Sequence, residues 1–179
     1  MVIIKYFVHG TTTDNVEDKS TGWLPGVLTD IGIQQSVDLA KTIKEEDFDI
    51  VFCSDLSRAV ESTKLAFYNR EIKIKQDKRL RECNYGDLNG KDHNLVDYYS
   101  HIDKRFPNGE SMKDVEKRIR SFIEYLKKNY DGKKIAIVCH KAPQLAFEVI
   151  CNRKSWQDAL DTDWRNTKAW QPGWVYEVW

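Results

Sequence analysis

The sequence has no excess of charge of either sign, since Lys plus Arg and Asp plus Glu each number 28 among its 179 residues. A general nucleic-acid or membrane-surface binder needs a basic excess, so this balance argues against both classes of partner. The chain also has no apolar run as long as a membrane helix, and its start, MVIIKYFVHG, lacks the basic region and cleavage site of a signal peptide. Any anion site must therefore be a local cluster of positive groups.

Cysteine is scarce and scattered. The four cysteines form no CxxC pair, and Cys53 and Cys139 each end an apolar run, as buried free thiols do. This pattern favours a reduced, cytoplasmic compartment over a disulfide framework. Hydrophobic residues make up 41% of the chain and aromatic residues 12%, which excludes a disordered chain. The length suits a single domain, which we place at residues 1–179.

Strand-like and helical segments alternate along the chain. Apolar, β-rich runs predict strands at residues 2–8, 48–53, 72–76, 134–139 and 174–178. Helices are predicted after the caps Thr29, Ser54-Asp55 and Ser111, and from about 143 to 151, whereas 80–110 is expected to be irregular loop with one short helix. This alternation predicts an α/β three-layer sandwich, with helices on both faces of a mostly parallel sheet and the most hydrophobic strand, 134–139, at its centre.

Polar side chains follow three of the predicted strands. His9 follows the first, Arg58 lies shortly after the second, and His140 and Lys141 follow the strand at 134–139. Ligands bind beyond the carboxyl ends of parallel strands, so these groups should share one rim. A lone histidine at such a place is more often structural or solvated, whereas two histidines and an arginine together favour a functional site.

Six segments carry a family resemblance that spans nearly the whole chain. In order they are HGTT at 9–12 with Asn15, LTDIGIQQ at 28–35, SDLSRA at 54–59, LRE at 80–82 with Gly86 and Gly90, PNGES at 107–111 and VCH at 138–140. Each motif alone is weak, but six at ordinary spacing are specific. The sequence resembles the histidine phosphatase superfamily, the phosphoglycerate mutase-like group that includes small broad-specificity phosphatases.

The resemblance implies a metal-independent phosphomonoesterase that hydrolyses a small phosphorylated metabolite through a phosphohistidine intermediate. Its nucleophile would be His9, whose neutral imidazole needs no separate base. Arg58 and a protonated His140 would hold the phosphoryl oxygens, and Glu82 would act first as general acid and then as general base. Further phosphate contacts would come from Asn15 and Thr12. No metal and no cofactor is assigned, and a homodimer is left open.

One position departs from the family pattern. The family carries an arginine directly before the nucleophile, and this chain has Val8 there. Losing one preorganised donor typically costs about 10²–10³ in rate. Lys141 is expected to compensate in part as a phosphate-binding ammonium, and Lys5 is a second candidate. The departure predicts a weakened phosphatase, with a non-catalytic phospholigand-binding protein as the alternative. Phosphoglycerate mutase is a further alternative, disfavoured because the chain is short around residues 84–110.

Two proposed catalytic residues have structural alternatives. Arg58 could pair along its own helix with Asp55 or Glu61, each three residues away. Glu82 could be an ordinary solvated carboxylate between Arg81 and Cys83.

Two further groups of residues are ambiguous. His93 and His101, with Asp97 between them, could mimic metal ligands on one helix face, although we favour a solvated face. Most tryptophans lie in one loop and the tail, at Trp23, Trp164, Trp170, Trp174 and Trp179. We expect them to complete the core and cover the sheet edge. The alternative is an aromatic wall around an organic leaving group, or a dimer surface.

Overall fold

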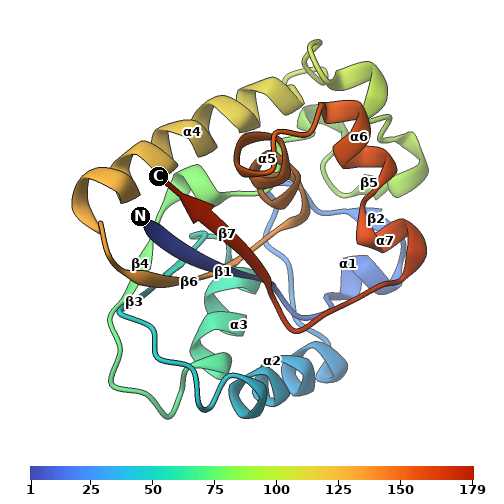
Figure 1. The fold of residues 1–179 in the computed structure, drawn as a ribbon. Helices are drawn as coiled ribbons and strands as arrows, with labels where there is room; N and C mark the ends of the chain where they lie inside the picture. Colours follow the sequence, from blue (N-terminus) through green and yellow to red (C-terminus); the bar gives the residue numbers. More distant parts are fainter.

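The computed structural model covers residues 1–179 and contains a five-stranded sheet. The strand order is β4 (Ile74–Gln76), β3 (Ile50–Cys53), β6 (Lys134–Cys139), β1 (Val2–Val8) and β7 (Trp174–Val178). The first four strands are parallel and β7 runs antiparallel to β1, so the two chain ends lie together (Figure 1). All five predicted strands are confirmed, with β6 in the centre, although β3 and β4 each begin two residues later than expected.

Helices cover both faces of the sheet. The helices α4 (Met112–Asn129) and α5 (Lys141–Cys151) lie on one face, and α2 (Asp30–Thr42) and α3 (Ser57–Ala66) lie on the other (Figure 1). Successive side chains of β1 point to opposite faces of the sheet. Tyr6 packs in the larger core cluster with α4 and α5, whereas Phe7 packs in the smaller one with Ile43 and Phe67. The predicted α/β sandwich is confirmed.

The predicted helix caps hold in two of three cases. The Thr29 side chain accepts a hydrogen bond from the Gly32 amide, and Ser111 forms a reciprocal capping box with Asp114. The expected cap at Ser54-Asp55 is wrong, because α3 begins after Leu56 without a side-chain cap and the Ser54 hydroxyl accepts from the Leu56 amide instead.

The buried face of α2 consists of small residues. Its buried positions are Gly32, Ser36 and Ala40, whereas Ile33 is exposed. The reason is a close approach of two backbones, since a Cβ on Gly32 would lie 2.0 Å from the Thr11 carbonyl oxygen. Only small residues fit where α2 meets the loop that leaves β1.

The segment expected to be loop with one short helix is more structured than that. It forms three short 3₁₀ turns, η2 (Gly86–Leu88), η3 (His93–Leu95) and η4 (Tyr99–His101), and a fourth, η1 (Lys78–Leu80), leads into it. A small second sheet pairs β2 (Lys19–Ser20) with β5 (Lys91–Asp92). Three short helices were not predicted, namely α1 (Thr13–Val16), α6 (Trp156–Asp161) and α7 (Trp164–Thr167). None of the helices combines the length and apolar character that a membrane crossing requires.

Candidate active site

Strand register brings the two candidate histidines together. Val8 at the end of β1 lies opposite Cys139 at the end of β6, and the His9 amide donates to the Cys139 carbonyl over 3.0 Å. The next residues, His9 and His140, therefore leave the sheet side by side, with ring centroids 5.1 Å apart. The buried thiols that end the strands, Cys53 and Cys139, are free and packed in the core, as expected.

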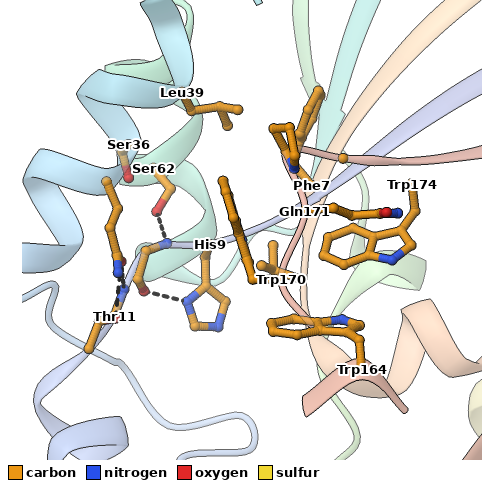
Figure 2. A pocket seen from close by; sticks show the side chains of 15 residues that line it. Phe7, His9, Thr11, Ser36, Leu39, Ser62, Trp164, Trp170, Gln171 and Trp174 are labelled. Carbon is orange, nitrogen blue, oxygen red and sulfur yellow. Dashed lines mark hydrogen bonds between the residues drawn. The ribbon is translucent and has the colours of Figure 1, made fainter. Parts of the chain in front are cut away.

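The local contacts of His9 select one tautomer. Its Nδ1 lies 2.8 Å from the carbonyl oxygen of Gly10, to which it donates, so the Nε2 lone pair is left for another partner (Figure 2). The Gly10 amide in turn donates to the Ser62 hydroxyl over 3.0 Å. Burial and the nearby Arg58 charge lower the pKa of His9 to about 3, so the imidazole is neutral at pH 7. This is the form that a nucleophile requires.

His140 carries two buried nitrogens without a protein partner. The residue is completely buried, and neither Nδ1 nor Nε2 makes a hydrogen bond. Its backbone is fixed by Tyr6, whose hydroxyl donates to the His140 carbonyl over 2.7 Å and accepts from its amide over 3.2 Å. Unsatisfied buried polar atoms are rare in folded proteins, so these two nitrogens are available to a water molecule, an ion or a ligand.

The protonation of His140 differs from the expected one. Burial, and then the charge of Arg58, hold the pKa of His140 well below its usual value of 6.5, so protein groups alone leave the ring neutral at pH 7. The predicted imidazolium needs an added negative charge beside the ring, such as a phosphate dianion, to raise this pKa.

Arg58 enters the site from the first turn of α3. Its side chain is buried, and its Nη1 and Nη2 donate to the carbonyls of Leu24 (3.1 Å) and Gly22 (2.8 Å). The alternative of an ion pair along its own helix is wrong, because both Nη atoms bond to these carbonyls and not to Glu61, and Asp55 pairs with Arg81 over 2.6 Å. Two carbonyls thus hold the guanidinium plane in place while leaving its other N–H groups as donors.

Glu82 lies at the N-terminus of α5. Its carboxylate accepts hydrogen bonds from three backbone amides, those of Cys83 (2.8 Å), Ala142 (2.9 Å) and Lys141 (3.1 Å). The carboxylate thus accepts from amides that have no partner within the helix, and the N-terminus of a helix is a favourable place for a negative group. At 8% exposure Glu82 is not the solvated carboxylate of the alternative interpretation.

These side chains line one cavity of about 460 Å³, which we call the polar pocket. It contains six of the seven residues singled out from the sequence, His9, Asn15, Arg58, Glu82, His140 and Lys141. Asn15 leaves its Nδ2 without a protein acceptor, since only its Oδ1 is engaged by the Thr12 amide. Thr12 itself does not line the pocket: its hydroxyl accepts from the Asn15 amide and caps α1, which corrects its expected contact with phosphate.

Two other expectations about charged residues need correction. Lys5 does not reach the polar pocket, because its ammonium pairs with Glu46. His93 and His101 do not share a helix face, since they lie on the separate turns η3 and η4. His93 lines the pocket with its Nδ1 2.9 Å from the Ser20 hydroxyl, while His101 stacks on Phe106 elsewhere, with ring centroids 3.9 Å apart.

Sequence reasoning missed several pocket residues, above all Arg165, Tyr85 and Tyr98. Tyr85 and Tyr98 come from the irregular segment and contact each other through their hydroxyls over 3.1 Å. Arg165 comes from α7 in the tail. None of the three follows a strand of the main sheet. The rule that ligands bind beyond the carboxyl ends of parallel strands therefore does not predict them.

A second cavity of about 320 Å³ adjoins the first and shares Val8, His9, Thr11 and Trp164 with it. We call it the aromatic cavity, since Phe7, Trp164, Trp170 and Trp174 line it. Figure 2 shows Trp164 and Trp174 on one side and His9 with Thr11 on the other, and the two tryptophan rings stack with centroids 5.1 Å apart. Trp174 packs against the main core from the edge strand β7, as expected, whereas Trp170 is exposed and lines the aromatic cavity instead of completing the core.

A family model described as histidine phosphatase superfamily (branch 1) matches residues 7–169. The chain belongs to this superfamily. Among curated proteins it is 32% identical over 149 residues to a 2,3-bisphosphoglycerate-dependent phosphoglycerate mutase of Allorhizobium ampelinum, a match covering 74% of this chain and 71% of the mutase. Other curated mutases match over 96 residues, which is 42% of their length.

Solved structures of the superfamily have the same fold. The Bacillus stearothermophilus protein YhfR is 26% identical with a TM-score of 0.80, covering 89% of this chain and 84% of its own. The alpha-ribazole phosphatase of Shigella flexneri is 25% identical with a TM-score of 0.79 and the same two coverages. The relatives of this superfamily member therefore include both mutases and a small-metabolite phosphatase.

Proposed function

We propose that this chain is a phosphomonoesterase that hydrolyses a small phosphorylated metabolite through a phosphohistidine on His9. The observation that carries the proposal is the polar pocket itself, in which a neutral His9 faces Arg58, Glu82 and a His140 with two unpartnered buried nitrogens. A phosphoryl group between these side chains would supply the hydrogen-bond acceptors that His140 lacks within the protein.

The proposed reaction has two steps. In the first, the Nε2 lone pair of His9 forms a bond to phosphorus while the bond from phosphorus to the ester oxygen breaks, and the Glu82 carboxyl group gives its proton to that oxygen. In the second, the Glu82 carboxylate takes a proton from water, whose oxygen displaces His9 and forms free phosphate. Arg58 and His140 stabilise the charge on the phosphoryl oxygens throughout.

Turnover of an aryl phosphate in the presence of EDTA tests this proposal. We expect phosphate release by the wild type and a loss of at least about 10³-fold on His9→Ala, because the covalent route is then closed. The wild type should form an acid-labile phosphoprotein that can be trapped, and His9→Ala should not. Phosphate binding without any turnover would instead identify the non-catalytic alternative, and EDTA-sensitive turnover would contradict the mechanism.

Mutase activity is the second candidate, because the curated relatives are phosphoglycerate mutases. Such a mutase moves the phosphoryl group between two oxygens of its substrate instead of giving it to water. Interconversion of 2- and 3-phosphoglycerate that outpaces phosphate release would place the chain with those relatives. We rank hydrolysis first because the segment around residues 84–110 is short.

A further inference from the structure

The polar pocket has a strongly unequal distribution of charge. Its lining includes four cationic side chains, Lys19, Arg58, Lys141 and Arg165, whereas Glu82 is its only carboxylate. Arg165 and Lys141 lie in its wall next to Trp164. The chain as a whole has no net charge, so this local excess is a built feature of the pocket.

A buried carboxylate holds the two extra cations in the wall. Asp163 has a side chain that is 1% exposed, and its Oδ1 accepts from Arg165 Nη1 over 2.9 Å. Its Oδ2 lies 3.4 Å from the ammonium of Lys141. The second arm of the Arg165 guanidinium, Nη2, donates to Gln144 Oε1 over 2.9 Å. The guanidinium also stacks on Trp164, 4.4 Å from the ring centroid, so its position is fixed from three directions.

The charge of Arg165 reaches the nucleophile. Burial is the main cause of the low pKa of His9, and the positive charges of Arg58 and Arg165 lower that pKa further. His9 thus lies in the field of two guanidinium groups, one from α3 and one from α7. Lys141 is less suited to replace an arginine, because its ammonium is held between Asp163 and the ring of Tyr98, 4.3 Å from the centroid.

We propose that Arg165 supplies the second guanidinium for the transferring phosphoryl group, in place of the arginine that the superfamily carries where this chain has Val8. The inference rests on the proposed function, since it concerns how that same pocket grips phosphate. Val8 lines the pocket but offers no donor, and two N–H donors of Arg165 are used by Asp163 and Gln144, which leaves others for phosphoryl oxygens. Asp163 and Gln144 are its positioning residues.

The test compares Arg165→Gln and Arg165→Lys with Arg105→Gln, a control arginine that pairs with Asp114 outside both cavities. We expect Arg165→Gln to raise the Kd for inorganic phosphate about 10- to 100-fold and to lower kcat/KM for an aryl phosphate about 10²-fold. Arg165→Lys should fall between, and Arg105→Gln should match the wild type. Arg165→Gln should also lower the melting temperature, because it removes a partner of the buried Asp163 carboxylate, whereas Arg105→Gln breaks an exposed ion pair and should leave the melting temperature nearly unchanged.

A second-site variant tests the replacement directly. Adding Val8→Arg to Arg165→Gln should recover part of the lost phosphate affinity, because it restores a guanidinium at the usual place. Unchanged phosphate affinity in Arg165→Gln, or no recovery of phosphate affinity by Val8→Arg, would overturn the inference. If the wild type shows no turnover, the proposed function fails, and calorimetry with inorganic phosphate still decides the role of Arg165.

Discussion

The polar pocket and the aromatic cavity meet at His9, but the chain builds them in different ways. In the polar pocket, His9 and His140 follow the ends of β1 and β6 and Arg58 lies on α3, so the register of the parallel sheet sets their positions. Glu82 comes from the loop after η1 and is held by amides at the start of α5. The aromatic cavity depends on the tail, which supplies Trp170 and Trp174, whereas α2 and α3 supply residues such as Leu39 and Ser62.

The two regions also differ in the charge of the residues that line them. The polar pocket concentrates cations and unpartnered donors around one carboxylate, whereas among the residues that line the aromatic cavity only His9 is titratable. The chemistry of phosphoryl transfer needs the first kind of environment. We therefore expect substitutions in the two regions to have very different effects.

The largest effect that separates the two regions is expected at Glu82. Glu82→Gln removes the proposed proton donor, so kcat should fall about 10²–10⁴-fold, and the loss should be greater for alkyl phosphates than for aryl phosphates with good leaving groups. The amide oxygen can still accept from the Cys83 and Ala142 amides, as Oε1 does, but the NH₂ group cannot accept from the Lys141 amide. One buried donor therefore loses its partner, at a cost of about 1–3 kcal/mol in the free energy of unfolding.

A matched control is Glu116→Gln. Glu116 is also a largely buried carboxylate, accepting from Arg120 and from the Trp156 indole N–H over 2.7 Å, but it lies outside both cavities. The control should lose stability without losing activity. A Glu82→Gln enzyme with wild-type kcat on alkyl phosphates would remove Glu82 from the proposed mechanism.

The sequence predicts more of the fold than of the pocket. Apolar runs and caps such as Ser111 set the five strands and the main helices, because these signals are local. The meeting of His9 and His140 follows from a general rule about parallel strands. The positions of Arg165 and Trp170 depend on how the tail packs across the sheet end, and no local periodicity of the sequence encodes that packing.

Acid should destabilise the protein through the polar pocket. The pKa of His9 is lowered to about 3 and that of His140 lies well below 6.5, whereas unfolded histidines titrate near 6.5. The unfolded state therefore binds more protons as the pH falls below about 6.5, and stability that is complete above this pH is lost toward pH 3. Each unit of pKa shift corresponds to about 1.4 kcal/mol.

Urea unfolding at a series of pH values measures this dependence. His140→Asn should have a shallower loss of stability between about pH 6.5 and pH 4 than the wild type, because one of the depressed groups is gone. Saturating phosphate should protect the wild type over the same range by binding the folded state. Identical slopes for the wild type and His140→Asn would show that acid acts elsewhere in the molecule.

The smallest effect is expected at Trp170, which lines only the aromatic cavity and is 60% exposed. Trp170→Ala should change kcat/KM less than about threefold for aryl and alkyl phosphates, because Glu82, the proposed donor to the leaving oxygen, lines only the polar pocket. An in-line leaving group lies opposite His9 Nε2, on the Glu82 side. Trp174→Ala is the control for stability, since it breaks the stack on Trp164. A selective loss of aryl phosphate turnover in Trp170→Ala would place the leaving group in the aromatic cavity. It would contradict the expectation that only the polar pocket contacts the substrate.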